Sequence, residues 1–375
     1  MTVTSITCQI PPSAFNYNIE IGSGILDRQA QYLRPLAYRF AIVSDDLVAP
    51  LYGERMLRSL SSAGINVDLF LFPHGERCKT RSIKENVENE LFEKGFSRDS
   101  CVIALGGGVV TDLGGYLAAT FCRGVPLVMA PTSLLAMVDA SIGGKTGVNI
   151  PQGKNMVGCI YQPKKVIVDI STLQTLPQNE LANGIVETIK HALIADSKLF
   201  EYLETYADDI LALEPTILTN VIAASCLIKK TIVEQDEKEN GKRRLLNCGH
   251  TVGHAIEQLM DYALPHGEAV ALGILIECCI AWKMGFLDQQ VIDRILSLFI
   301  KIGISLRLPS KVSPQSLMNT MTLDKKSLRG RPRFVMLDAI GSALSFDSAY
   351  CTYVEESLIA FAIDHVWNNL NAGIR

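Results

Sequence analysis

Three of the six histidines lie close together in the chain, and their spacing is the first sign of chemistry. His250 and His254 are four residues apart, so on a helix they would share one face, and His266 follows downstream. Glu187, on a predicted helix, is a candidate further ligand, and Lys190 would lie on the same face. Imidazole and carboxylate ligands suit zinc, and a catalytic zinc keeps one open position beside three protein ligands. The spacing predicts a metal or catalytic site. It does not decide which histidine of the first pair binds metal.

A run of three glycines, Gly106 to Gly108, follows an apolar stretch and precedes a helical pattern. The backbone N–H groups of such a turn can approach a phosphate at the start of a helix. The run is neither GxGxxG nor a Walker loop, and a tight strand-to-helix turn without a ligand is an equally good interpretation. Asp45 ends another apolar run and could bind ribose hydroxyls, although an exposed loop aspartate is the simpler reading of that residue alone.

The segment from Asp139 to Asn155 combines several glycines with two lysines, Lys145 and Lys154. Lysines on a glycine-rich backbone suit a phosphate or carboxylate, because N–H donors add to the point charges of the ammonium groups. A merely solvated loop would not need this much glycine. The segment is therefore a second candidate for binding an anion.

The elements that must position these residues change in character near residue 175. Before it, short β-rich runs alternate with amphipathic stretches, which predicts a mostly parallel α/β sheet. The predicted strands are Phe40–Val43, Val67–Phe72, Cys101–Leu105, Leu127–Ala130 and Val166–Asp169, with helices at Leu51–Ser62, Thr80–Lys94 and Leu113–Phe121. After it, helices are predicted at Asn179–Ala195, Pro215–Asp236, Gly249–Met260, Gly267–Trp282 and Gln290–Ile302. We expect an α/β domain over residues 1–175 and an all-α domain over residues 176–375.

Composition excludes several classes of protein. A chain of 375 residues that is 48% hydrophobic is neither disordered nor fibrous and suggests two domains. A net charge of −4 without a basic block argues against a nucleic-acid binder. The scattered cysteines, without a CxxC pair, indicate a reducing compartment. Residues 1–18 do not read as a signal peptide, and the apolar stretch Ala269–Trp282 reads as a buried helix. We expect a cytoplasmic protein.

Taken together, the motifs resemble those of the 3-dehydroquinate synthases, within the sugar phosphate cyclases, from about Asp45 to Gly341. Several independent motifs occur in the family's order. They are Gly106-Gly-Gly with Asp112, Cys122-Arg-Gly124, Pro131-Thr-Ser-Leu-Leu135, Asp139-Ala-Ser-Ile-Gly-Gly-Lys145, Gly153-Lys-Asn155, Glu187-Thr-Ile-Lys190, Arg243 to His254, His266-Gly-Glu268 and Asp324-Lys-Lys326. The resemblance implies a Rossmann-like NAD-binding domain followed by a helical domain, with the active site between them.

The resemblance also implies NAD and a divalent metal, usually zinc, with cobalt as an alternative. The matching metal ligands are Glu187, His250 and His266, which leaves His254 facing the substrate. In the family that substrate is 3-deoxy-D-arabino-heptulosonate 7-phosphate. NAD oxidises a hydroxyl transiently, phosphate is eliminated, the ketone is reduced again, and the ring opens and recloses by an intramolecular aldol step. NAD is therefore regenerated in each turnover. Members of the family are commonly homodimers.

Motif matching assigns the remaining site residues. The substrate and catalytic residues would be Arg123, Asp139, Lys145, Asn155, Lys190, Lys229, Arg243, Asn247, His254 and Lys326. The NAD contacts would be Asp45, Glu76, Lys79, Gly106, Gly107, Gly108, Asp112, Thr132, Ser133, Lys145 and Lys154. The chain departs from the usual pattern at Leu47, Thr111, Ser133 and Ser342, which puts cofactor affinity in question and not the reaction class.

Two other enzyme classes remain as alternatives. One is another sugar phosphate cyclase, which would make 2-deoxy-scyllo-inosose or a valiolone. Lys229, Arg243, Asn155 and His254 favour a carboxylated substrate instead. The other is a metal-dependent NAD alcohol dehydrogenase, which would accumulate NADH. A non-enzymatic protein would have lost ligands or cationic residues, and no such loss is seen.

Overall fold

The computed structural model describes residues 16–307, 312–323, 331–347 and 349–373. Residues 1–15, which include most of the segment tested for a signal peptide, lie outside the described residues. So does Lys326, together with the motif around it.

The first half of the chain builds a six-stranded sheet in the order β1-β8-β5-β4-β2-β3, with every neighbouring pair parallel. All five predicted strands are present, and the sequence analysis missed β1, a half-exposed edge strand. The strands are β1 Asn18–Gly22, β2 Arg39–Asp45, β3 Asn66–Phe72, β4 Ser100–Gly106, β5 Leu127–Pro131 and β8 Lys165–Asp169. Helices α1 Ala30–Leu33, α2 Glu54–Ser62, α3 Arg81–Glu93 and α4 Gly108–Thr120 connect them. The predicted parallel α/β arrangement is confirmed.

Both faces of this sheet are buried, as parallel sheets require. Alternate residues of β2 enter different clusters: Phe40 and Ile42 join one hydrophobic cluster, while Ala41 and Val43 join another. The second cluster continues into the helical half of the chain, through Ile185 and Val186. Because buried side chains run across residue 175, the division into residues 1–175 and 176–375 remains a proposed one.

A β-hairpin lies between β5 and β8. Its strands β6, Lys145–Ile150, and β7, Gly153–Ile160, pair antiparallel, and β6 packs along α4. The hairpin was not predicted, although it carries Lys145, Lys154 and Asn155.

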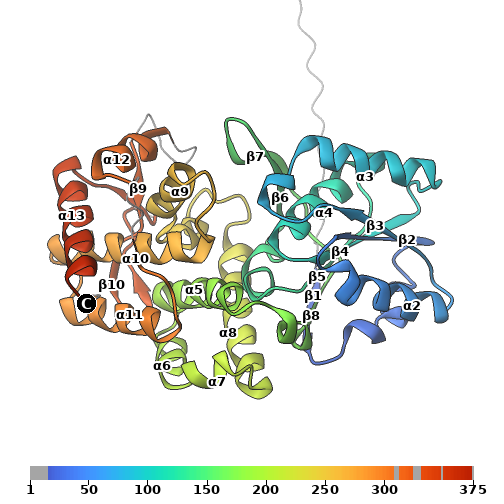
Figure 1. Ribbon diagram of the computed structural model, residues 1–375, viewed down its shortest axis with the longest axis horizontal. Helices are drawn as coiled ribbons and strands as arrows, with labels where there is room; N and C mark the ends of the chain where they lie inside the picture. The colour runs from blue at the N-terminus through green and yellow to red at the C-terminus, as the bar shows by residue number, and fades with distance from the viewer. Residues whose placement is uncertain (1–15, 308–311, 324–330, 348, 374–375) are drawn as a thin grey trace, which may run out of the picture.

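The second half of the chain is helical, as expected (Figure 1). Its helices are α5 Gln178–Ala195, α6 Ser197–Thr205, α7 Ala207–Leu211, α8 Pro215–Gln235, α9 His250–Leu259, α10 His266–Lys283, α11 Gln289–Lys301, α12 Pro314–Leu323 and α13 Glu356–Gly373. This half is not purely α-helical, because short strands form two two-stranded sheets. β9 Arg333–Phe334 pairs with β12 Thr352–Tyr353, and β10 Leu337–Ala339 pairs with β11 Ser342–Ala343.

Two apolar helices of the second half pack against other helices of the protein. The stretch Ala269–Trp282 lies in α10, which is buried at nearly every position, so the expected buried helix is confirmed. Among the described helices, α8 alone is long and apolar enough to cross a membrane. It packs against α5, and its inward face carries the polar residues Ser225 and Lys229.

Asp169 ties the edge of the sheet to the core. Its fully buried carboxylate accepts hydrogen bonds from the backbone N–H groups of Gly24 (2.8 Å) and Leu26 (3.0 Å), and from Ser171. We expect Asp169→Ala to lower the free energy of unfolding by roughly 3 kcal/mol, because buried donors lose their acceptor. Thermal and urea denaturation would measure the loss. Asp99→Ala, at an exposed turn, is the control, and an equal loss there would contradict this account.

Candidate active site

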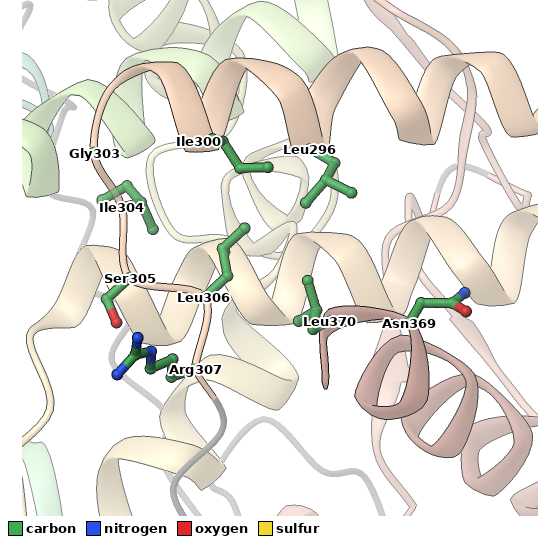
Figure 2. A pocket seen from close by; sticks show the side chains of 9 residues that line it. All are labelled: Leu296, Ile300, Gly303, Ile304, Ser305, Leu306, Arg307, Asn369 and Leu370. Carbon is green, nitrogen blue, oxygen red and sulfur yellow. The ribbon is translucent and has the colours of Figure 1, made fainter. Parts of the chain in front are cut away.

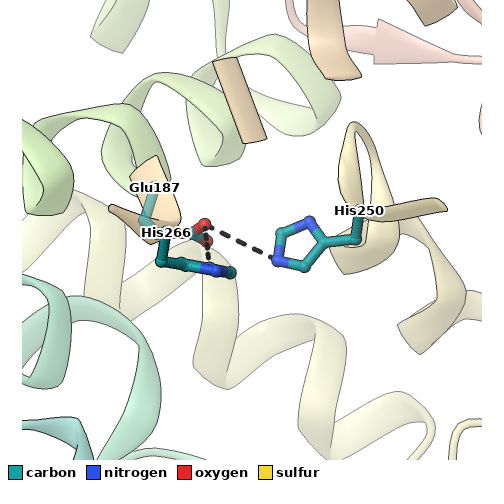
Figure 3. Close-up of side chains that lie close together, drawn as sticks. All are labelled: Glu187, His250 and His266. Atoms are coloured by element: carbon teal, nitrogen blue, oxygen red, sulfur yellow. Dashed lines mark ion pairs between the residues drawn. The ribbon is translucent and has the colours of Figure 1, made fainter. Parts of the chain in front are cut away.

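Three side chains from three helices converge at one point in the helical half of the chain (Figure 3). Nε2 of His266 lies 3.3 Å from Oε1 of Glu187, and Nε2 of His250 lies 3.6 Å from the same oxygen. One ligand atom from each residue falls within 4.8 Å of the others. The geometry therefore brings together the trio that the family resemblance names, with His250 rather than His254 facing Glu187.

Helix starts and close helix packing position this trio. Gly249 adopts φ +76°, a left-handed conformation that suits glycine, and α9 begins with His250 directly after it. α10 begins with His266 after Pro265. A Cβ at Gly273 in α10 would overlap the carbonyl oxygen of Gly249, so glycine there allows the two helices to approach. The first residues of both helices consequently reach the same carboxylate on α5.

The trio fits a divalent cation. Oε1 of Glu187 is buried and accepts no hydrogen bond from a described residue, while its other oxygen receives the Lys190 ammonium. Burial alone would lower the pKa of His266, but the carboxylates of Glu257 and Glu187 outweigh burial and raise it to about 10. The site thus attracts positive charge, and a bound cation would take the place of the proton. His250 Nδ1 lies 3.0 Å from the Cys248 carbonyl oxygen, which turns Nε2 toward Glu187.

Two other groups of acidic and histidine side chains lie close enough together to hold an ion, but in both a lysine contacts the same carboxylate oxygen that faces the histidine. In the trio, Lys190 contacts the other oxygen of Glu187 and leaves Oε1 to the histidines. In the group of His254, Glu257 and His266, the Lys154 ammonium lies 2.8 Å from Oε1 of Glu257. In the group of Asp139, Glu187 and His191, Lys190 and Lys229 supply the positive charge. The trio of Glu187, His250 and His266 is the best candidate metal centre.

Glu257 orients one of the candidate ligands. It lies on α9, 2% exposed in its side chain, with Oε1 3.3 Å from Nδ1 of His266. A carboxylate at Nδ1 holds the proton there and leaves Nε2 available for a metal. The buried contact with Glu257 is therefore part of the candidate metal centre.

We expect Glu257→Gln to weaken metal binding by about 10- to 100-fold, because outer contacts of metal-binding histidines commonly have effects of this size. Competition with a chelating dye would measure the metal dissociation constant. Glu268→Gln is a matched control, because Glu268 lies two residues after His266 and makes no hydrogen bond or ion pair with it among the described contacts. Equal weakening by both variants would show that only net charge matters.

A second cluster surrounds Asp139, at the end of a short helical turn after β5. Lys229 on α8 donates to its Oδ1 at 2.7 Å, and the Lys190 ammonium lies 3.9 Å from the same atom. Burial opposes ionisation of Asp139, but the two lysines outweigh it and hold the pKa of Asp139 well below its usual range. Burial lowers the pKa of Lys229 to about 8 despite the neighbouring carboxylate. Lys190 contacts Glu187 as well, so this cluster adjoins the metal centre.

A third cluster joins the hairpin to the segment before α9. Lys145 at the start of β6 and Asn247 both donate to the carboxylate of Glu239. Arg243, 1% exposed, donates to the carbonyl oxygen of Gly143 at 2.8 Å and to that of Glu237. Lys145, Arg243 and Asn247, all predicted to bind substrate, thus lie in one neighbourhood.

The predicted NAD residues gather at the carboxyl edge of the sheet and the start of α4. Lys79 lies 2.9 Å from Asp112 and 3.2 Å from Glu76, and Lys154 lies 3.9 Å from Glu76. α4 starts at Gly108, where unpaired backbone N–H groups favour a phosphate. Three other predicted NAD residues make local contacts. The Asp45 carboxylate accepts from the N–H of Val48, and the N–H of Thr132 donates to the carbonyl oxygen of Gly106. The Ser133 hydroxyl lies 3.4 Å from where a Cβ at Gly107 would be.

The contacts of the predicted NAD residues, the metal centre and the Asp139 cluster link into one network. Lys154 reaches Glu76 beside the predicted NAD residues and Glu257 beside the metal centre. Lys190 then joins Glu187 to Asp139. The half-buried His254 ring lies beside the other two histidines, with ring centroids 5.2 and 6.2 Å away.

Two predicted residues are exposed and lie at the margin of these clusters. Arg123 follows the carboxyl end of α4 and is exposed, and it makes no side-chain hydrogen bond or ion pair with another described residue. Asn155 lies on the exposed start of β7, where its N–H donates to the side chain of Asn149, whose amide donates in turn to Glu76. Their roles remain predictions.

A cavity of about 400 Å³ lies away from this network, between α11, the segment after it and the end of α13 (Figure 2). Its lining is mostly apolar, with Leu296, Ile304 and Leu370, and includes no carboxylate or imidazole. It is not the candidate active site.

The sequence analysis missed three residues of these clusters. Glu257 lies three residues after His254 and seven after His250, a helical spacing that could have shown it. His191 follows Lys190 directly and lies 3.6 Å from Asp139. Glu239 sits in a charged stretch with φ +60°, and nothing in the sequence marked it.

Comparisons with known proteins show which proteins the chain resembles over its length. The family model described as 3-dehydroquinate synthase N-terminal matches residues 69–183, and that described as 3-dehydroquinate synthase C-terminal matches residues 184–327. The chain is 45% identical over 338 residues to a 3-dehydroquinate synthase of Desulforamulus reducens, covering 89% of this chain and 94% of the relative. A solved 2-deoxy-scyllo-inosose synthase complexed with carbaglucose-6-phosphate, NAD+ and Co2+ has a TM-score of 0.85 at 27% identity, covering 93% of this chain and 96% of the other. The 2-epi-5-epi-valiolone synthase of Streptomyces hygroscopicus, with NAD+ and Zn2+ bound, has a TM-score of 0.87 at 25% identity, covering 96% and 99%.

Proposed function

The chain belongs to the 3-dehydroquinate synthase family and has that activity, and we propose that the linked clusters described above carry it out in one site. It is a lyase that converts 3-deoxy-D-arabino-heptulosonate 7-phosphate to 3-dehydroquinate and phosphate, a step of the shikimate pathway. The observation that carries the site assignment is the network in which Lys154 and Lys190 connect the predicted NAD residues, the metal trio and Asp139.

Two groups would be held by this chain. Glu187, His250 and His266 would bind a divalent metal, zinc or cobalt, and the start of α4 with Lys79, Asp112 and Glu76 would bind NAD. When bound, NAD accepts and returns a hydride, and the metal polarises the hydroxyl that is oxidised. The similar solved structures of the 2-deoxy-scyllo-inosose synthase, with NAD+ and Co2+, and of the 2-epi-5-epi-valiolone synthase, with NAD+ and Zn2+, support both assignments.

The chain's own side chains would bind and orient the substrate. Asp139 and Lys229 would hold the reacting hydroxyl and the carboxylate, with Lys190 holding Glu187 in place. Lys145, Arg243 and Asn247 would face the substrate's anionic groups, and His254 would contact it beside the metal. Cationic side chains around a phosphate and a carboxylate supply the electrostatic stabilisation that elimination of phosphate needs.

The experiment is a phosphate-release assay with the heptulosonate, run while NADH absorbance is followed. We expect phosphate release without net NADH, and complete loss of release with a chelator, restored by zinc or cobalt. NADH accumulation would indicate an alcohol dehydrogenase. Cyclisation of glucose 6-phosphate or sedoheptulose 7-phosphate, without phosphate release from the heptulosonate, would indicate another cyclase. The sequence identities do not favour another cyclase. The chain is 45% identical to the relative named 3-dehydroquinate synthase, but 27% and 25% identical to the two other cyclases.

We also propose a cytoplasmic homodimer, in keeping with the family and with cysteines that are free among the described residues. Sedimentation equilibrium of the purified protein would test the dimer, and a single species at the mass of one chain would refute it.

A further inference from the structure

A histidine that no motif identified is buried beside Asp139. His191 lies on α5 next to Lys190 and is fully buried. Its Nδ1 lies 2.7 Å from the hydroxyl of Ser225, and its Nε2 points toward Oδ1 of Asp139 at 3.6 Å. Nε2 makes no hydrogen bond to any described residue. A buried polar nitrogen aimed at a site carboxylate calls for a role, because an unpaired buried donor costs stability.

The carboxylate of Asp139 is held on one side. Its hydrogen bond from Lys229 and its longer contacts with Lys190 and His191 are all to Oδ1. No hydrogen bond from a described residue reaches Oδ2. Residues of α8 and α5 therefore contact Oδ1 of Asp139, and Oδ2 is available to a ligand.

The arrangement selects one tautomer of His191. Burial lowers its pKa, so the imidazole is neutral and carries one N–H. With the carboxylate of Asp139 opposite Nε2, the proton belongs on Nε2, and the Ser225 hydroxyl donates to Nδ1. The opposite tautomer would set a nitrogen lone pair against the carboxylate.

The two other roles that these residue types suggest do not fit. Ser225 is fully buried on α8, so it is no nucleophile, although serine, histidine and aspartate stand in the order of a hydrolase triad. His191 is no metal ligand with Asp139, because the ammonium groups of Lys190 and Lys229 supply the positive charge there.

We propose that His191 is a positioning residue, which with Ser225 fixes the Asp139 carboxylate so that its Oδ2 meets the substrate's reacting hydroxyl. The proposal rests on the function proposed above, in which Asp139 holds that hydroxyl. The Nε2–H group of His191 needs to move only a few tenths of an ångström to reach hydrogen-bond distance from Oδ1 of Asp139. A residue that acts by orientation affects the chemical step more than the binding of substrate.

The first test compares two replacements of His191 in the full-length, metal-loaded enzyme. His191→Phe keeps a ring but loses the donor, and we expect kcat to fall about 30-fold with KM changed less than about threefold. His191→Gln can place an amide N–H where Nε2 was, and we expect it to recover most of kcat. Ser225→Ala should lower kcat less than His191→Phe does. Thr188→Val is the matched control with unchanged kcat, because among the described contacts the buried hydroxyl of Thr188 bonds only to its own helix at Gly184.

The second test asks whether His191 acts through Asp139. In an Asp139→Ala background, we expect His191→Phe to lower kcat by less than about twofold further, since coupled residues are not additive. Effects that multiply would overturn the proposal, as would full kcat in His191→Phe or no recovery in His191→Gln. Failure of the wild-type enzyme to release phosphate would instead refute the proposed function, before any variant is compared.

Discussion

Replacing His250 by alanine should abolish stoichiometric metal binding and lower turnover by roughly a thousandfold or more. Only Glu187 and His266 would remain of the trio, and Glu187 would keep its contact with Lys190. Two protein ligands do not make a stable catalytic site. A metal supplies several kcal/mol of transition-state stabilisation, so its loss has at least this effect on rate. Elemental analysis after dialysis, together with the phosphate-release assay, would measure both results.

His254→Ala is the matched control for this experiment. His254 lies on the same helix, four residues on, with its ring 5.2 Å from that of His250 between centroids. We expect it to retain one metal per chain while losing turnover, because it faces the substrate in the proposed function. A His250→Ala protein that keeps its metal, or a His254→Ala protein that loses it, would show that the ligand trio is wrong.

The parallel sheet and the long helices could be predicted because their sequences carry strong periodic signals. β2 and β4 are apolar runs buried on both faces, and α5 and α11 begin and end within two residues of the predicted bounds. β1 gave a weaker signal, since it is a half-exposed edge strand that pairs only with β8. The small sheets of the helical half are built from strands of two or three residues, which are too short to show a period.

The β6–β7 hairpin shows why a glycine-rich segment is ambiguous. A Cβ at Gly158 would overlap the carbonyl oxygen of Thr146 on the opposite strand. Gly143 takes φ +88° in the turn before β6, where the Arg243 guanidinium packs against it. Close strand packing and turn geometry explain these two glycines, whereas the sequence analysis explained the glycines of this segment by an anion. The case for an anion now rests on Lys145 and its surroundings.

The metal trio could be named only through the family's motifs, since spacing alone left His250 and His254 as alternatives. In the structure, α9 packs on α10 and α10 packs on α5, and this tertiary packing, which no local pattern encodes, brings Nε2 of His250 within 3.6 Å of Glu187. The residues that contact the site residues from outside were harder still to predict from the sequence. Glu239 reaches Lys145 across 94 positions of chain, and Ser225 reaches His191 across 34. Such contacts arise from tertiary structure, so one sequence did not reveal them.

Lys145→Ala should separate function from stability more clearly than any other change at the site. The Lys145 side chain is 51% exposed, and its ion pair with Glu239 is a surface contact of the kind that contributes ~0–1 kcal/mol. We therefore expect the Tm of the ligand-free protein to fall by less than about 4 °C. In the proposed function its charge stabilises the departing phosphate, and loss of one such group costs about 100- to 1,000-fold in kcat/KM.

Lys230→Ala is the matched control for Lys145→Ala. Lys230 is equally exposed, at 50%, and pairs with Glu234 at 2.9 Å, but it belongs to none of the three clusters. Its loss should change Tm by a similar small amount and leave kcat/KM unchanged. The comparison isolates the ligand as the partner that matters, because both variants lose one positive charge of similar exposure and one ion pair. A Tm lowered far more in Lys145→Ala than in Lys230→Ala, or an unchanged kcat/KM, would mean that Lys145 supports the hairpin and not the substrate.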